Sequence, residues 1–316
     1  MSAFFLSLLL IGGSAAYVAW AAHLIVQGAP AWWFVVGAPV AAFALPFMLT
    51  SAWFTMAWVW RTPRPPEAQL TAAASLRMFG AEVLTVAASW LWMALHALLI
   101  RHPPPALATR PVVLIHGVVT NDGMWFWLRR YLARHRVGPV YTVNYGPPLA
   151  DIESFTAQLA AKIDQVRAAT GAAGVALVGH SMGGLVARAY LRRYGDERVT
   201  QLMTIGTPHH GSILACIVPG ACLAQMRPGN AWLAALNQDE GAPLPVPTVS
   251  IWSRHDSMVV PQASCVLEGV ENIALTGIGH NALLRDERVH ALIAQRLTII
   301  DTRAAPVRAE KTAAAS

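Results

Sequence analysis

The chain has 316 residues, of which 55% are hydrophobic and only 13% charged, and its mean hydropathy is +0.44. This composition is too apolar for an ordinary soluble domain and indicates a membrane portion joined to one globular domain. The net charge is +6, but no arginine-rich cluster is interleaved with aromatic residues. The charge therefore argues against a nucleic-acid-binding protein and fits basic loops beside a membrane.

The first 60 residues contain no Asp, Glu, Lys or Arg. A membrane helix needs about 20 apolar residues to cross about 30 Å of hydrocarbon, so Phe4–Val26 and Trp32–Trp60 are candidate spans. Pro39 and Pro46 predict a break or tilt in the second one. A cleaved signal peptide is the alternative for the first segment. That segment lacks a basic amino-terminal region and a second apolar segment follows it, so we expect an anchor in a bacterial inner membrane.

A third uncharged segment, Val83–Ile100, decides the predicted topology. Residues 1–100 are therefore predicted to form two or three transmembrane helices. We favour three, which places the globular part in the periplasm. The alternative is that this segment lies flat on the membrane surface, with the globular part in the cytoplasm. Arg61–Arg77 before it is proline-rich and basic, as cytoplasmic loops tend to be. Residues 101–110 contain Pro103–Pro105 and form a stiff linker, because proline locks φ and lacks an N–H.

Residues 111–300 are predicted to form one α/β domain with a doubly wound, mostly parallel sheet, because strand and helix patterns alternate along them. The Ala-rich, polar residues 301–316 are expected to be a disordered tail. The expected strands are Val112–Ile115, Val140–Tyr145, Val175–His180, Val199–Ile205, Pro247–Trp252 and Asn272–Leu275. The expected helices are Asp122–His135, Ile152–Val166 and the segment after Ser181.

Val175–Gly184 reads as a buried strand, a sharp turn and a helix, with the pattern Gly-x-Ser-x-Gly around Ser181. In such a nucleophile elbow the serine sits in a strained backbone conformation and presents its oxygen at the carboxyl end of the sheet. Gly179 and Gly183 have no Cβ, so strand and helix can approach closely. The N–H of Met182 would then point to the place where an oxyanion forms. The pattern predicts Ser181 as a nucleophile.

A serine hydroxyl needs a base, usually a histidine that a carboxylate holds in the correct tautomer. Asp256 follows the strand that ends at Trp252, and His280 follows the strand around Ile273. Both lie where a parallel sheet gathers its ligands, and the order Ser, Asp, His is the one that accompanies a nucleophile elbow. We predict the triad Ser181, His280 and Asp256. Weaker candidates for acid or base are Asp239, Glu268, His209, His210 and His255.

Acyl transfer also needs donors to the developing oxyanion, each contributing about 3 kcal/mol. Besides Met182, the loop after the first strand should supply one, because Gly117 lets the backbone turn inward. The N–H of Val118 is our choice. The side chains expected to line the pocket are those of His116, His180 and His209.

The chain has three cysteines and no Cys-x-x-Cys pattern, which argues against a structural zinc site. Cys216 and Cys222 could form a disulfide in an oxidising compartment. The alternative is that they are two small buried residues.

Four motifs in order resemble the bacterial triacylglycerol lipase and esterase branch of the α/β-hydrolases. They are Val113–Gly117, Gly179–Gly184, Thr207–Ser212 and the segments around Asp256 and His280. The resemblance covers residues 111 to about 297. It implies the same triad, Ser181, Asp256 and His280, and the same oxyanion donors, Val118 and Met182.

The resemblance also assigns residues 211–230 to a lid over a lipid-binding pocket, although plain core packing would explain their apolar composition equally well. Several secreted lipases of this family bind a structural calcium ion near the histidine loop. The matching carboxylate pair is missing from this sequence, so we expect no metal and no cofactor. The membrane anchor is a second departure from those lipases.

We therefore expect a membrane-anchored serine hydrolase that cleaves carboxylic esters, with lipid or acyl esters as substrates and the bilayer as its surroundings. An acyltransferase or a thioesterase would use the same triad, and sequence alone does not separate these activities. A non-catalytic membrane scaffold is the third possibility. A complete set of candidate triad residues argues against it.

Overall fold

A six-stranded parallel sheet organises the globular part, with the strand order β2-β1-β3-β4-β5-β6. The computed structural model describes residues 2–238 and 244–299, so the predicted tail at residues 301–316 lies outside the described residues. The prediction of a doubly wound, mostly parallel sheet is confirmed. The strands are β1 (Val112–Ile115), β2 (Val140–Val143), β3 (Val175–His180), β4 (Val199–Ile205), β5 (Thr248–Ser253) and β6 (Glu271–Leu275).

Helices cover both faces of this sheet, because its short strands are apolar on both sides. Side chains alternate along a strand, so Val113 and Ile115 of β1 pack under α6 and α7, whereas Val112 and Leu114 pack under α5 and α10. All four side chains are at most 1% exposed. The helices are α5 (Phe126–Arg134), α6 (Ile152–Thr170), α7 (Met182–Tyr194) and α10 (Glu287–Ile299).

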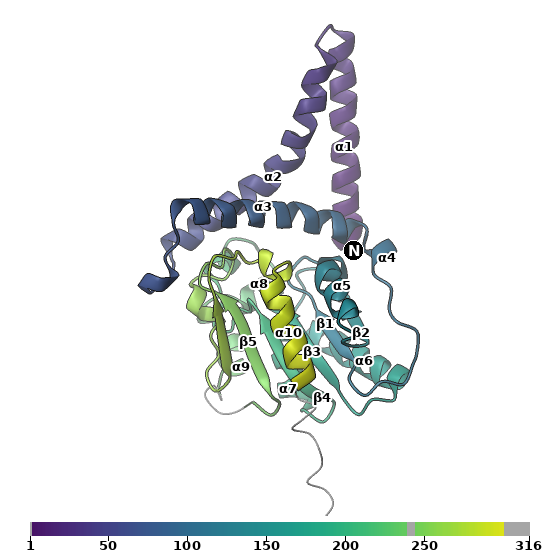
Figure 1. The fold of residues 1–316 in the computed structure, drawn as a ribbon, viewed down its shortest axis with the longest axis vertical. Coiled ribbons are helices and arrows are strands. Elements are labelled where there is room, and N and C mark those ends of the chain that lie inside the picture. Colours follow the sequence, from purple (N-terminus) through teal and green to yellow (C-terminus); the bar gives the residue numbers. More distant parts are fainter. Residues whose placement is uncertain (1, 239–243, 300–316) are drawn as a thin grey trace, which may run out of the picture.

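Two apolar helices, α1 (Ser2–Val26) and α2 (Ala31–Val59), project away from the sheet domain (Figure 1). Among the described residues only α2 is long and apolar enough to cross a membrane, and 17% of its most apolar window is buried. The described side chains of α1 form the apolar stretch Gly12–Val26, which is shorter than a span. The prediction of two or three spans is therefore corrected to one candidate.

The predicted third span is wrong. Val83–Ile100 belongs largely to α3 (Ala72–Ala94), which lies across the sheet domain (Figure 1). The hydroxyl of Thr71 caps its first turn by accepting a hydrogen bond from the N–H of Ala74. Glu82 on this helix is fully buried against the globular part, where neutral donors satisfy its carboxylate. The periplasmic location depended on a third span and is withdrawn with it.

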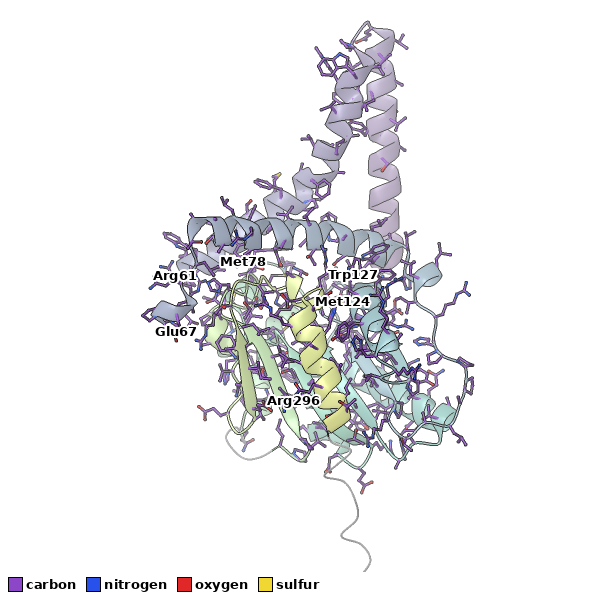
Figure 2. All side chains as sticks on the ribbon, in the orientation of Figure 1. Arg61, Glu67, Met78, Met124, Trp127 and Arg296 are labelled. Atoms are coloured by element: carbon purple, nitrogen blue, oxygen red, sulfur yellow. The ribbon has the colours of Figure 1, made fainter. Side chains whose placement is uncertain are left out.

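Aromatic side chains fill the contact between α3 and the domain. Trp92 of α3 stacks on Phe126 with ring centroids 4.4 Å apart and meets Trp127 edge-on at 6.1 Å. Figure 2 shows Met124 and Trp127 directly beneath α3. The helix is therefore part of the packing of the globular domain.

Short helices and loops complete the chain. The segment 211–230, predicted to be a lid, buries Ala215, Cys222 and Leu223 in the core but leaves Ile217 and Val218 58% and 48% exposed. Cys216 and Cys222 are free thiols, so the disulfide alternative does not hold in this structure. The short helices are η1 (Pro66–Ala68), α4 (His96–Leu99), η2 (Asp122–Trp125), η3 (Ile213–Cys216), α8 (Ala221–Gln225), α9 (Ala231–Leu236), η4 (Gln262–Cys265) and η5 (Ala282–Leu284).

Candidate active site

Ser181 lies in the tight turn between β3 and α7 with φ 55° and ψ −126°. A positive φ is strained for a residue that carries a Cβ, so the surrounding structure must hold it in place. The N–H of Ser181 donates to the carbonyl of Ile205 at 2.8 Å, which fixes the turn to β4. A Cβ on Gly183 would lie only 2.2 Å from the carbonyl oxygen of Ile115. The first turn of α7 therefore presses directly against β1.

The sheet topology places Ser181 where ligands bind in doubly wound folds. The strand β1 lies between β2 and β3, so the chain turns to opposite sides of β1. At such a switch point the loops after the two central strands separate and leave a crevice at their carboxyl ends. Ser181 follows β3 and Gly117 follows β1, and both therefore face this crevice.

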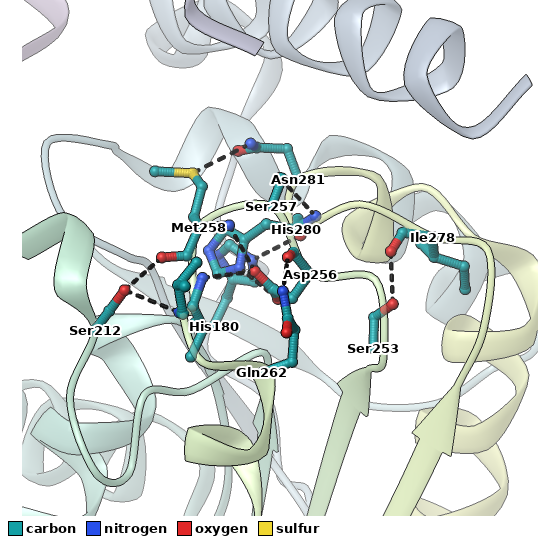
Figure 3. Close-up of polar contacts among 12 residues, drawn as sticks. His180, Ser212, Ser253, Asp256, Ser257, Met258, Gln262, Ile278, His280 and Asn281 are labelled. Carbon is teal, nitrogen blue, oxygen red and sulfur yellow. Dashed lines mark hydrogen bonds and ion pairs between the residues drawn. The ribbon is translucent and has the colours of Figure 1, made fainter. Parts of the chain in front are cut away.

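His280 and Asp256 form a buried pair at the same edge of the sheet (Figure 3). The Nδ1 of His280 is 2.8 Å from Oδ2 of Asp256, and the two residues are 2% and 0% exposed. The other carboxylate oxygen, Oδ1, accepts the backbone N–H groups of Met258 and Val259 at 2.8 and 2.7 Å. Because Nδ1 donates to the carboxylate, Nε2 of His280 is left as a proton acceptor.

The charges around His280 favour its protonated form. Burial alone lowers the pKa of this imidazole, but the charge and hydrogen bond of Asp256 and the charge of Glu82 outweigh it, so the pKa is raised above 6.5. Glu82 comes from α3, which the sequence analysis did not connect with this site. The raised pKa makes His280 a stronger base than an ordinary histidine.

His180 connects the serine turn to the histidine loop. It directly precedes Ser181, its ring centroid lies 4.6 Å from that of His280, and its Nε2 is 3.3 Å from the carbonyl oxygen of His280. Burial, followed by the charge of His280, holds the pKa of His180 well below its ordinary value. Among the described residues no hydrogen bond joins the Ser181 hydroxyl to His280. Such bonds often form only when substrate is present.

The loop after β1 lies against the serine. A Cβ on Gly117 would lie 3.1 Å from the Cβ of Ser181, so the two backbones meet at the crevice. Tyr145 fixes this loop by donating its hydroxyl to the carbonyl of His116 and by stacking on that ring, with centroids 4.1 Å apart. Met182 is the first residue of α7, and its N–H therefore has no acceptor within the helix. Val118 is partly buried against the core below.

Three cavities adjoin these loops. One of about 380 Å³ is lined by His116, Thr120 and Tyr145, among others. A narrow one of about 10 Å³ is lined by Gly117, Met182 and apolar neighbours such as Phe155. A much larger one of about 740 Å³ lies between the end of α2, the segment after it and α3, and it reaches His255 and Asp256. Most of its wall is apolar, but Arg61 and Arg64 also line it.

The other candidate histidines have different surroundings. His116 lines the narrow cavity, and burial lowers its pKa to about 4, so it is neutral at pH 7. His209 is fully buried, with hydrogen bonds to Arg188 and Thr204, which is the pattern of a structural histidine. His255 accepts the N–H of Gly277 through Nδ1. Within the described residues no group of three or more His, Cys, Asp or Glu side chains could hold a metal ion.

Sequence reasoning missed one residue of this site, Glu82. It directly precedes the uncharged segment Val83–Ile100, and the sequence pattern assigns it no role. A lone carboxylate beside an apolar segment is the only signal in the sequence. Nothing in its spacing connects it with His280, which is 198 positions away.

Comparison with known proteins agrees with this architecture. Residues 111–240 match the palmitoyl protein thioesterase family. The triacylglycerol lipase of Pseudarthrobacter phenanthrenivorans is 39% identical over 120 residues, which are 35% of this chain and 37% of the relative. That of Burkholderia plantarii is also 39% identical over 120 residues, covering 35% and 33%. The chain thus spans about a third of the length of these curated relatives.

Solved structures give the fold. Aspergillus fumigatus lipase B superposes with a TM-score of 0.53 at 23% identity, covering 60% of this chain and 52% of that one. Mature Bacillus licheniformis lipase BlEst2 superposes with a TM-score of 0.54 at 18% identity, covering 63% and 96%. The globular part of the chain therefore has an α/β-hydrolase fold of the kind found in lipases. Its residues 111–240 are similar in sequence to palmitoyl protein thioesterases, and 120 residues of the chain are similar to triacylglycerol lipases.

Proposed function

We propose that the chain is a serine hydrolase that cleaves carboxylic esters through a covalent acyl-enzyme. The observation that carries the proposal is the strained Ser181 at the end of β3, directly after His180, whose ring lies 4.6 Å from that of His280. His280 in turn forms a buried pair with Asp256 at an Nδ1–Oδ2 distance of 2.8 Å. Nε2 of His280 takes the proton of the Ser181 hydroxyl as its oxygen attacks the ester carbonyl. Asp256 holds the tautomer and stabilises the imidazolium. The proton then passes to the leaving alcohol, and water hydrolyses the acyl-enzyme.

The negative oxygen of the tetrahedral intermediate is assigned to the backbone N–H groups of Met182 and Val118. The first is at the amino-terminal end of α7, where N–H groups and the helix dipole favour negative charge. The second belongs to the loop that approaches Ser181 so closely that a Cβ on Gly117 would lie 3.1 Å from the Cβ of Ser181. Burial lowers the pKa of His116 and of His180 beside this loop, so both imidazoles are neutral and the proposed stabilisation comes from the two backbone N–H groups.

The substrates proposed are acyl esters of lipids. Support comes from the apolar cavity of about 740 Å³ between α2, α3 and the Asp256 loop, and from the similarity to triacylglycerol lipases. The helix α2 is proposed to tether the domain to a membrane. The segment 211–230 is proposed as a lid, since Ile217 and Val218 expose apolar surface while their neighbours anchor it in the core.

A thioesterase is the second candidate, because residues 111–240 match the palmitoyl protein thioesterase family. The same nucleophile, base and oxyanion donors cleave a thioester, with a thiol as the leaving group. Hydrolysis rates of an acyl ester and the matching acyl thioester on the same preparation compare the two activities. A higher kcat/KM for the thioester by more than about tenfold, or 1.4 kcal/mol, would favour this second candidate.

The test of the proposal is Ser181→Ala assayed with p-nitrophenyl acyl esters. We expect turnover to fall to the background of the uncatalysed reaction while the circular dichroism of the protein stays unchanged. Retained turnover in Ser181→Ala would exclude the proposed mechanism.

A further inference from the structure

Glu82 is a buried carboxylate that α3 inserts behind the proposed catalytic histidine. Its residue exposure is 0%. Oε1 accepts the N–H of Asn281 at 2.9 Å, the side-chain amide of Asn281 at 3.0 Å and the hydroxyl of Ser257 at 3.0 Å. Oε2 accepts the N–H of Ala282 at 2.8 Å. All four partners are neutral donors, so the carboxylate charge is solvated by the histidine loop itself.

These partners are the neighbours of His280. Asn281 and Ala282 follow it directly, and the hydroxyl of Ser257 accepts the N–H of His280 at 3.3 Å (Figure 3). The same hydroxyl donates to Glu82. A Cβ on Gly279, the residue before His280, would lie 2.4 Å from Oε2 of Glu82. The backbone on both sides of His280 is thus in direct contact with one side chain of α3.

The same helix also holds the loop on the other side of the crevice. The side-chain amide of Asn121 donates to the carbonyl of Met93 at 3.0 Å, and His96 after the helix bonds Asp122 at 2.8 Å. A Cβ on Gly123 would lie 2.3 Å from the carbonyl oxygen of Trp92. Glu82 and Met93 are about 16 Å apart along the helix, at 1.5 Å per residue. One helix, α3, therefore contacts both the histidine loop and the loop after β1.

We infer that Glu82 is a positioning residue for His280, and that α3 sets the histidine loop at a fixed distance from the oxyanion loop. This inference rests on the proposed function, since it assigns His280 as the base. Rate falls steeply when a catalytic group is misplaced, by as much as about 100-fold for 1 Å. The helix that packs beside the α1–α2 pair is then also the element that holds the catalytic geometry together.

Glu82 acts on His280 through its charge as well as through the backbone. The titratable groups that face His280 are Asp256 from the loop after β5, Glu82 from α3 and His180 from β3. His180 is neutral at pH 7, so the two carboxylates supply the negative field. Removing the charge of Glu82 should lower the pKa of His280 and leave the Asp256 hydrogen bond in place.

The experiment compares Glu82→Gln, Glu82→Asp and the control Glu67→Gln with the wild-type full-length protein. Glu67 lies exposed in η1, shortly before α3. Its replacement therefore makes the same chemical change, from Glu to Gln, at a position away from the site. The measurements are kcat per fluorophosphonate-reactive serine, KM, the pH profile of kcat/KM and an NMR titration of the His280 imidazole. The last measurement needs no turnover.

For Glu82→Gln we expect kcat to fall about 10- to 100-fold with little change in KM. The acid limb of the profile and the His280 titration should both move to lower pH. Glu82→Asp keeps the charge but shortens the reach, so kcat should fall while the acid limb stays near that of the wild type. Glu67→Gln should match the wild type in every measurement.

The inference would be overturned if Glu82→Gln kept the wild-type kcat and the acid limb of its kcat/KM profile stayed at the wild-type pH. A lower kcat with an unmoved limb would also overturn it, because that is the behaviour of a residue needed only for folding. If Glu82→Gln does not fold, Glu82→Asp decides, and wild-type kcat in that variant overturns the inference. A wild type that neither hydrolyses esters nor reacts with fluorophosphonate would refute the proposed function instead, and the NMR titration of Glu82→Gln or Glu82→Asp would still test the contact with His280.

Discussion

Asp256 meets His280 with only one of its two carboxylate oxygens. Oδ2 receives the Nδ1 of His280 at 2.8 Å, while Oδ1 receives the backbone N–H groups of Met258 and Val259. The orientation of the carboxylate is therefore fixed by the backbone before any substrate arrives. The same two N–H groups would therefore also fix the orientation of the amide in Asp256→Asn.

In Asp256→Asn the two backbone N–H groups would hold the amide oxygen, and the NH₂ group would face His280. Nδ1 must then accept, which places the proton on Nε2, where the serine needs an acceptor. We expect kcat to fall on the order of 10³–10⁴-fold with the fold intact. Asp164→Asn, at a carboxylate with a 54% exposed side chain on α6, is the control and should retain activity. A loss of less than tenfold in Asp256→Asn would contradict this account of the acid.

The pH profile of the wild type reports the surroundings of His280. The base must be neutral to act, so kcat/KM rises as the pH increases through the pKa of His280. That pKa is raised above 6.5 because Asp256 and Glu82 outweigh the effect of burial. We expect the acid limb of kcat/KM, measured with a neutral ester, to lie above pH 6.5. A limb below 6.5 would show that burial dominates over the two carboxylates.

The close approach of α7 to β1 makes Gly183 sensitive to any side chain. A Cβ there would lie 2.2 Å from the carbonyl oxygen of Ile115, which is backbone and cannot rotate away. We expect Gly183→Ala to lower the free energy of unfolding by about 3 kcal/mol, as overpacking of a rigid site does. Gly80→Ala in α3, where nothing lies within 4 Å, is the control and should leave stability equal or higher by up to about 1 kcal/mol. Equal melting temperatures for the two variants would contradict this geometry.

Because α2 is apolar, we expect the protein to partition into membranes rather than into the aqueous phase. Many of its apolar side chains are exposed, among them Trp32, Val36 and Met48 at 64%, 60% and 65%. Exposing so much apolar surface to water along a 29-residue helix is unfavourable, whereas a bilayer would bury it. We expect the full-length protein to stay in the membrane pellet after extraction with alkaline carbonate and to enter solution with detergent. Release by carbonate alone would exclude α2 as a membrane-spanning anchor.

The sequence predicted the sheet domain well because its signals are local. Each strand is a short apolar run, and the glycines around Ser181 indicate a sharp turn between a strand and a helix. Three boundaries moved by a few residues. The second strand ends at Val143 instead of Tyr145, and the helix expected from Asp122 begins as η2, so that α5 starts only at Phe126. The third is the end of α6, which continues to Thr170 before Gly171 caps it with φ 70°. These ends depend on hydrogen bonds to neighbouring elements rather than on composition.

The position of α3 could not be predicted in the same way. An uncharged run of 18 residues has the composition of a membrane span, and only tertiary contacts distinguish a helix packed on a protein from one packed in lipid. Those contacts are Glu82 with the histidine loop and Trp92 with Phe126, both between segments far apart in the chain. The burial of His209 could not be inferred either, because its hydrogen-bond partners Arg188 and Thr204 come from α7 and β4.

The central claim is that Ser181 is an activated nucleophile, and mapping a fluorophosphonate adduct by mass spectrometry tests it most directly. The full-length protein is labelled in detergent at a pH above the acid limb of its own kcat/KM profile and again at pH 5, below the raised pKa of His280, and the modified peptide is sequenced. We expect one adduct, on Ser181, that forms quickly above the acid limb and slowly at pH 5, and none in Ser181→Ala. An unlabelled wild type, or an adduct on another serine such as Ser212 or Ser257, would contradict the account.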